Sequence, residues 1–170
     1  IKPGLPTVTL ADTISYHADG QAAGLTYGNG HLYTKTLNNL MQPDRVWVSG
    51  SGTTAFDRSY IYDGRGLVTS ITDGVASSAS QNFTYDGIGQ LKTASGVWGS
   101  GSYSYDALGN LLSKQLGSRT VGLSYDGQNR LASYTDSGPG GNKTLSYDAR
   151  GNVTALGGLT FTYDRSDQPI

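Results

Sequence analysis

Apolar and polar residues alternate along most of the chain, and the alternation recurs in short blocks that end in Tyr. Each block has an aromatic or aliphatic residue two positions before the Tyr, with Ser or Thr between them in most copies: Tyr60-Ile61-Tyr62, Phe83-Thr84-Tyr85, Tyr103-Ser104-Tyr105, Leu123-Ser124-Tyr125, Leu145-Ser146-Tyr147 and Phe161-Thr162-Tyr163. Residues two apart share one face of a β-strand. The pattern therefore predicts strands with an apolar, aromatic face and a hydroxyl-bearing face.

An Asp-x-x-Gly turn signal follows each of these strands. Asp is favoured at the first position of a type I turn, and Gly three residues later suits a backbone with positive φ. Where Gly is replaced, Asn or Asp stands there, and these residues tolerate positive φ best. The repeat-defining residues are Tyr62, Asp63, Gly66; Tyr85, Asp86, Gly89; Tyr105, Asp106, Gly109; Tyr125, Asp126, Asn129; Tyr147, Asp148, Gly151; and Tyr163, Asp164, with Asp167 at the last Gly position. Since Val or Leu then starts a return strand, each repeat is predicted to be a β-hairpin of about 20 residues.

Weaker copies precede the clear ones. Tyr16-His17-Ala18-Asp19-Gly20 has His17 in the Asp place, and Leu37 to Pro43 reads as a decayed copy because Met41 is poorly suited to positive φ. Asn29-Gly30 is a strong signal for a two-residue hairpin turn. We count about eight units, starting near residues 16, 37, 62, 85, 105, 125, 147 and 163.

These units predict one repeat array over residues 1–170, with weak repeats at 16–61 and clear repeats at 62–170. Four stretches are predicted to be loops between hairpins: residues 48–54, 76–80, 96–101 and 137–142. The chain starts without Met and ends within a repeat, and we therefore expect it to be a piece of a longer protein.

Composition and charge narrow the function classes. The 25 Gly against 5 Pro indicate many tight turns, and 12 Tyr against 3 Phe suit a sheet with one packed and one wet face. The net charge is −1 and the basic residues are scattered, which argues against nucleic acid as a partner. No apolar run approaches the length of a membrane span, so we expect no membrane insertion. Cysteine is absent, and disulfides and thiolate metal sites are thereby excluded.

No arrangement of residues predicts catalysis, a cofactor or a metal ion. The repeated Asp residues are spaced one per hairpin, which suits turn capping better than paired carboxylates or a calcium site. His17 and His31 without Cys make a poor zinc set. We therefore predict that the chain is not an enzyme. The aromatic residues leave a binding alternative open, because Trp98 in a Gly-rich loop could stack on a sugar ring, whereas Trp47 looks like part of the sheet.

The phrase Tyr-Asp-x-x-Gly-(Asn/Arg/Gln)-(Leu/Val), repeated every 20-odd residues, resembles the YD repeat of the Rhs-repeat family. This family includes bacterial polymorphic toxins, wall-associated toxins, the cocoon subunits of insecticidal toxin complexes, and teneurins. The resemblance implies an all-β array of hairpins forming a strongly twisted, curved sheet, a section of an Rhs-type β-shell. It further implies a bacterial protein, secreted or at the cell surface, whose wall encloses or displays a neighbouring C-terminal toxin segment. The self-cleaving Asp-Pro-x-Gly block of such shells is not found in this sequence.

The expected partners are the other repeats of the parent chain and its cargo. The concave inner face is expected to be rich in Ser, Thr, Gly and Tyr, and polar enough that the cargo does not pack natively against it. Bare strand edges would favour self-association. The alternative is a secreted or cell-surface binding module that recognises a glycan or a protein through exposed aromatic residues.

Overall fold

The computed structural model describes residues 9–170, which form β-strands and one short 3-10 helix. The chain divides into two compact units, residues 1–83 and 84–170. The elements are β1 (Ala11–Tyr16), β2 (Ala22–Tyr27), β3 (Leu32–Leu37), β4 (Pro43–Gly50), β5 (Thr53–Tyr62), β6 (Val68–Asp73), η1 (Ser77–Ala79), β7 (Gln81–Tyr85), β8 (Leu91–Gly96), β9 (Gly99–Tyr105), β10 (Leu111–Leu116), β11 (Arg119–Tyr125), β12 (Leu131–Asp136), β13 (Lys143–Tyr147), β14 (Val153–Leu156) and β15 (Leu159–Thr160).

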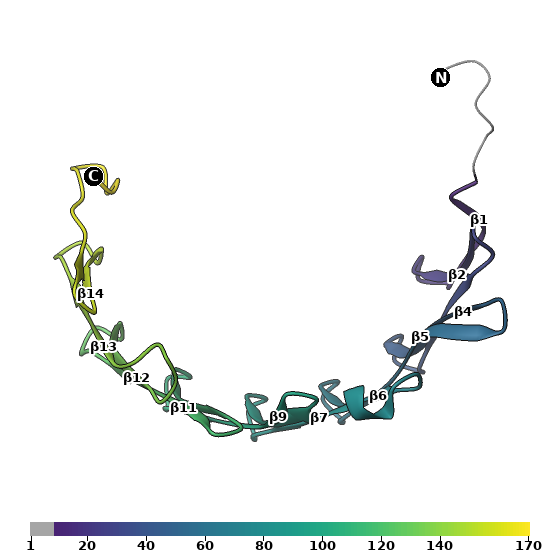
Figure 1. Cartoon of the computed structure of the whole chain (residues 1–170), viewed down its shortest axis with the longest axis horizontal. Helices are drawn as coiled ribbons and strands as arrows, with labels where there is room; N and C mark the ends of the chain where they lie inside the picture. The colour runs from purple at the N-terminus through teal and green to yellow at the C-terminus, as the bar shows by residue number, and fades with distance from the viewer. Residues whose placement is uncertain (1–8) are drawn as a thin grey trace, which may run out of the picture. The chain divides into compact units, whose positions relative to one another are not determined.

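The strands pair in chain order, β1 to β15, and each registered pair is antiparallel (Figure 1). The expected all-β array of hairpins is thereby confirmed for the described residues. Because the strands run up and down in sequence, their connections alternate between two rims. The Asp-x-x-Gly turns lie on one of them, which we call the turn rim. The remaining connections lie on the other, which we call the loop rim.

The turns of the weak repeats have the same hydrogen bonds as those of the clear repeats. The N–H of Met41 donates to the carbonyl of Asn38 at 3.0 Å, and Met41 has φ +61°. The expectation that Met41 would not adopt positive φ is therefore wrong. Tertiary pairing of β3 with β4 holds a residue in a conformation that it would rarely adopt alone.

Two of the loop-rim connections are tighter than the sequence indicated, and one is longer. Residues 48–50 and 53–54 lie in strands β4 and β5, so the predicted loop at 48–54 is only the turn Ser51-Gly52. The predicted loop at 96–101 likewise reduces to residues 97–98. Asn29-Gly30 is not a two-residue turn, because the N–H of Gly30 donates to Tyr27 and only Gly30 has positive φ.

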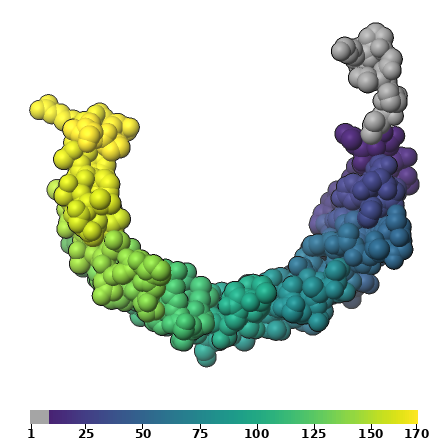
Figure 2. Space-filling view, viewed as in Figure 1, coloured from purple at the N-terminus to yellow at the C-terminus, as the bar shows by residue number. Residues whose placement is uncertain are grey.

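The sheet has almost no buried core. Among the described residues, Ala94 is the only buried hydrophobic residue and Asp73 the only buried charged one. In Figure 2 no second layer of chain lies against the strands of residues 84–170, coloured teal to yellow. Each unit is thus a single-layer sheet, and its strands must be held together chiefly by hydrogen bonds and by half-buried side chains.

Candidate functional site

The turn rim is built by the repeated Asp residues. In the turn after β9, Oδ1 of Asp106 accepts the backbone N–H groups of Leu108 and Asn110, each at 2.9 Å. The same pair of bonds, to the second and fourth residue after the Asp, occurs at Asp63, Asp86, Asp126, Asp148 and Asp164. Each carboxylate thereby satisfies two backbone donors that the turn leaves unpaired.

The pKa values of four of these carboxyls follow from the same contacts. At Asp106 the largest cause is the side-chain amide of Asn110, and it lowers the pKa. At Asp126 the backbone N–H of Arg130 is the largest cause, again lowering the pKa. Donors to a carboxylate favour its charged form. The pKa values of Asp63 and Asp148 are lowered in the same way. These four carboxylates are therefore ionised at neutral pH and already occupied as acceptors, which suits a structural role and not proton transfer.

The repeated Tyr residues make a hydrogen bond that the sequence patterns did not predict. Tyr105 donates its hydroxyl to the carbonyl of Leu91 at 3.0 Å, and Leu91 is the first residue of the return strand in the preceding repeat. The same bond joins Tyr62 to Pro43, Tyr125 to Leu111, Tyr147 to Leu131 and Tyr163 to Val153, at 2.8 to 3.0 Å. Burial raises the pKa of Tyr62 and Tyr105, so these hydroxyls remain protonated donors.

Gly, Asn and Asp occupy the fourth turn position for the reason that the sequence suggested. Gly66, Gly89, Gly109 and Gly151 have φ between +83° and +90°, and Asn129 and Asp167 have φ of +63° and +60°. This left-handed conformation closes the turn and returns the chain to the sheet. The Tyr, the Asp and this residue thus form rows along each unit and do not converge on a pocket.

In residues 84–170 one face of the sheet carries small hydroxyl side chains. Register and alternation place the following residues on this hydroxyl face: Thr84, Thr93, Ser95, Ser100, Ser102, Ser104, Ser113, Ser124, Ser133, Thr135 and Thr144. Hydroxyls pair directly across strands, as in Ser104 with Ser113 at 2.6 Å and Ser124 with Ser133 at 2.7 Å. Paired hydroxyls satisfy one another and leave a continuous polar surface.

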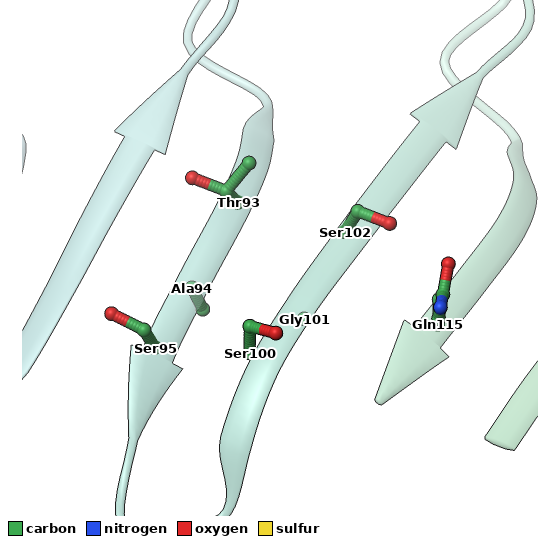
Figure 3. Close-up of a pocket in the computed structure, with 7 residues that line it drawn as sticks. All are labelled: Thr93, Ala94, Ser95, Ser100, Gly101, Ser102 and Gln115. Atoms are coloured by element: carbon green, nitrogen blue, oxygen red, sulfur yellow. The ribbon is translucent and has the colours of Figure 1, made fainter. Parts of the chain in front are cut away.

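A shallow groove of about 340 Å³ lies on this face. Figure 3 shows the hydroxyl side chains of β8 and β9 beside it, with Gln115 on β10 as the only amide among its lining residues. The lining contains no charged side chain and no large apolar one. Such a surface has no convergent group that would select one ligand.

The opposite face carries the tyrosines, and we call it the tyrosine face. In β9, Tyr103 and Tyr105 alternate with Ser102 and Ser104. Leu116 on β10 pairs with Gly101, and on this side its Cδ2 would lie 2.9 Å from a Cβ on Gly101. The expectation that one face would be rich in Ser, Thr and Tyr together is therefore wrong, since the period of two separates the hydroxyls from the rings.

Trp98 is the residue for which a ligand-stacking role was considered. Its side chain is 45% exposed at the loop rim. The ring folds back over Gly96, where an added Cβ would lie 2.7 Å from Cη2 of Trp98. One face of the indole is thus covered by the backbone of β8. The ring is therefore held against the strand.

Among the described residues no group of three or more His, Asp or Glu side chains is placed to hold a metal ion. His17, in the Asp place of its turn, bonds the carbonyl of Lys35 through Nε2 at 2.9 Å. No helix in residues 9–170 is long and apolar enough to cross a membrane.

A single-layer sheet with a row of capped turns and tyrosine ties between successive hairpins, and in residues 84–170 an uncharged hydroxyl face, defines a wall of YD repeats. The family model named teneurin YD-shell matches residues 17–166. The chain belongs to this family, which confirms the resemblance seen in the repeats. No curated protein sequence matches the chain.

Solved toxin-complex structures have the same fold. The complex TcdB2-TccC3-Cdc42 matches with a TM-score of 0.56 and 13% identity over 99% of this chain. TcdB2-TccC3 without its hypervariable C-terminal region matches with a TM-score of 0.52 and 13% identity over 92% of this chain. The Tc holotoxin pore of Photorhabdus luminescens matches with a TM-score of 0.50 and 16% identity over 98%.

This chain spans only 10–12% of the length of those three chains. It corresponds in fold to a section of the toxin-complex shell, and such a section is a structural element.

Proposed function

We propose that this section forms part of the wall of a closed β-shell, that its hydroxyl face points inward, and that the shell encloses a C-terminal toxin segment of the same protein until delivery. The observation that carries the proposal is the division of the single-layer sheet of residues 84–170 into an uncharged hydroxyl face and a tyrosine face. Membership of the YD-shell family supports the closed shell.

Two physical arguments favour the hydroxyl face as the inner one. On the concave side of a curved sheet the side chains converge, so small residues such as Ser and Thr fit there better than Tyr. A surface of mutually bonded hydroxyls also offers little apolar area, so a cargo gains little free energy by packing against it. The wall confines the cargo without binding it tightly.

The role is structural and not enzymatic. The turn carboxylates are occupied by backbone donors, as at Asp126, and the groove on the hydroxyl face carries no ionisable side chain. By analogy with the Tc holotoxin pore, we place the protein outside the cell that makes it.

The test uses the full protein that carries this section together with its C-terminal segment. The 170 residues contain no Cys, and any Cys elsewhere in the full protein is first replaced by Ser. Ser102→Cys on the hydroxyl face and Lys114→Cys on the tyrosine face then each introduce one probe. We expect a maleimide carried on a large polymer to label the Lys114→Cys variant and not the Ser102→Cys variant. A small maleimide should label both, which controls for thiol reactivity.

Equal labelling of both variants by the large reagent would show that the hydroxyl face is not enclosed. Protection of the Lys114→Cys variant alone would show that the tyrosine face points inward. Either result contradicts the proposal.

The second candidate is a binding module for glycans, and the observation in its favour is the fixed, 45% exposed ring of Trp98. In that case soluble oligosaccharides should change the tryptophan fluorescence of the chain, and Trp98→Ala should abolish the change. A response that persists in Trp98→Ala would eliminate this ring as the binding residue.

A further inference from the structure

At several turns the residue four positions after the turn Asp or Asn contacts the next repeat. We call it the turn-exit residue. Asn110 donates through Nδ2 to Oδ1 of Asn129, and Asn152 donates in the same way to Asp167 at 2.8 Å. Gln42 donates through Nε2 to the carbonyl of Gly66 at 3.3 Å. These bonds lie outside the strand ladders, so they are an additional connection between successive hairpins.

From Gln42 onward, the type of amide at the turn exit follows the residue that it meets. Gln21 precedes the repeat with Met41 at the positive-φ position and accepts a hydrogen bond from Nζ of Lys35 at 2.7 Å, and Leu67 carries no amide. Asn110 and Asn152 face Asn129 and Asp167, which have a side chain at the positive-φ position. Gln42 and Gln90 face Gly66 and Gly109, which have none: an added Cβ would lie 2.8 Å and 3.3 Å, respectively, from Nε2 of the Gln. The shorter Asn side chain thus contacts another side chain, whereas the longer Gln side chain fills the space next to a glycine.

Arg130 makes a third kind of contact. Its Nε donates to Asp126 at 2.8 Å, and its guanidinium lies 4.4 Å from the ring centroid of Tyr147 in the next repeat. It does not depend on the positive-φ residue of that repeat, since a Cβ added to Gly151 would have no neighbour within 4 Å. This position therefore provides an internal control for the other two kinds.

The pairing explains why Gly is replaced at two turns. A non-glycine residue with positive φ carries a conformational penalty, smallest for Asn and Asp. Asn129 and Asp167 accept hydrogen bonds that Gly could not accept from an Asn side chain. The amide of Asn110 is also fixed at its own turn, because the same Nδ2 donates to Asp106 at 2.8 Å. Asn152 is held by Asp148 in the same way at 3.0 Å.

We propose that, from Gln42 onward, an amide at the turn exit selects the repeat that can follow it in the array: Asn selects a repeat with Asn or Asp at its positive-φ position, and Gln selects one with Gly. The partner that this surface fits is the turn of another YD repeat. The selection concerns the order and register of repeats, and it stands independently of what the shell encloses.

The test is a double-mutant cycle on the whole 170-residue chain with Asn110→Gln and Asn129→Gly. Each change alone breaks a matched pair, and the two together create the Gln–Gly pair seen at Gln42 and Gly66. We expect the folding equilibrium constant of the double variant to exceed the product of the single effects by about threefold to tenfold, the size of one net hydrogen bond. Urea denaturation followed by circular dichroism measures it.

The control cycle combines Asn110→Gln with Gly151→Asn, which lie in repeats that are not neighbours, and its effects should multiply without coupling. Multiplicative effects in the Asn110–Asn129 cycle as well would overturn the proposal. If a single variant does not unfold cooperatively, NMR of the side-chain amides decides. The Asn110 amide resonances should shift in Asn129→Gly and stay in place in Gly151→Asn, and an unshifted Asn110 amide in Asn129→Gly would refute the contact.

Discussion

The tyrosine ties predict that removal of a single hydroxyl loosens the join between two repeats. Tyr125→Phe keeps the ring and deletes only the donor to the carbonyl of Leu111, which lies 3.0 Å away. One net hydrogen bond is worth about 1 kcal/mol. For a unit of about 60–100 residues, that loss lowers the melting temperature by roughly 4–8 °C.

The matched control is Tyr134→Phe. Tyr134 lies on the same face, and its hydroxyl has no hydrogen-bond partner among the described residues. Thermal and urea unfolding by far-ultraviolet circular dichroism should therefore show a loss of stability for Tyr125→Phe and little change for Tyr134→Phe. The triple change at Tyr105, Tyr125 and Tyr147 should cost about 3 kcal/mol if the ties are independent. Equal stability of the two single variants would refute the idea that these hydroxyls hold the repeats together.

Three further outcomes are expected. Met41→Gly should raise the free energy of unfolding by about 1 kcal/mol because it removes a strained positive φ, while Gly151→Ala should lower it by about the same amount; urea titration checks both. The pKa of Asp136 is lowered to about 2, chiefly by its bonds with an arginine side chain. Its stabilising contribution is thus complete above about pH 4 and is lost as the pH falls from about 4 towards 2, so Asp136→Asn should flatten the acid limb of a pH–stability curve. Gly96→Ala should displace the ring of Trp98 and shift the tryptophan emission to longer wavelength, and an unchanged spectrum would contradict the stacking of the ring on that glycine.

The hairpins were predictable from the sequence because their determinants are local. Alternation sets the strands, and the offset from Asp63 to Gly66 marks a turn that needs only those few residues. The same reasoning interpreted the turn at Met41 as decayed, whereas the turn is regular, because pairing of the flanking strands overrides the conformational preference of one residue. The predicted strands were also too short at Gly-rich stretches, since Gly50 and Gly99 take part in strand pairing.

The contacts between repeats could not be predicted in this way because they join residues about 10 to 24 positions apart. A signal for the tyrosine ties was nevertheless present: Phe occurs two residues before the motif Tyr, as at Phe83 and Phe161, but never in its place in the six clear copies. If the ring served only for packing, Phe would be accepted at the motif position as well as two residues before it. The joint appearance of Asn110 with Asn129, and of Asn152 with Asp167, was a comparable signal for the turn-exit pairs.

The lack of a buried core bears on how the protein responds to temperature. The heat-capacity change of unfolding grows with the apolar surface that becomes exposed, and in a single-layer sheet whose only buried hydrophobic residue in the described part is Ala94 that surface is small. A small heat-capacity change makes the curve of unfolding free energy against temperature broad and flat. We therefore expect this wall to lose little stability on cooling, and calorimetry should find a heat-capacity increment per residue below that of a globular domain.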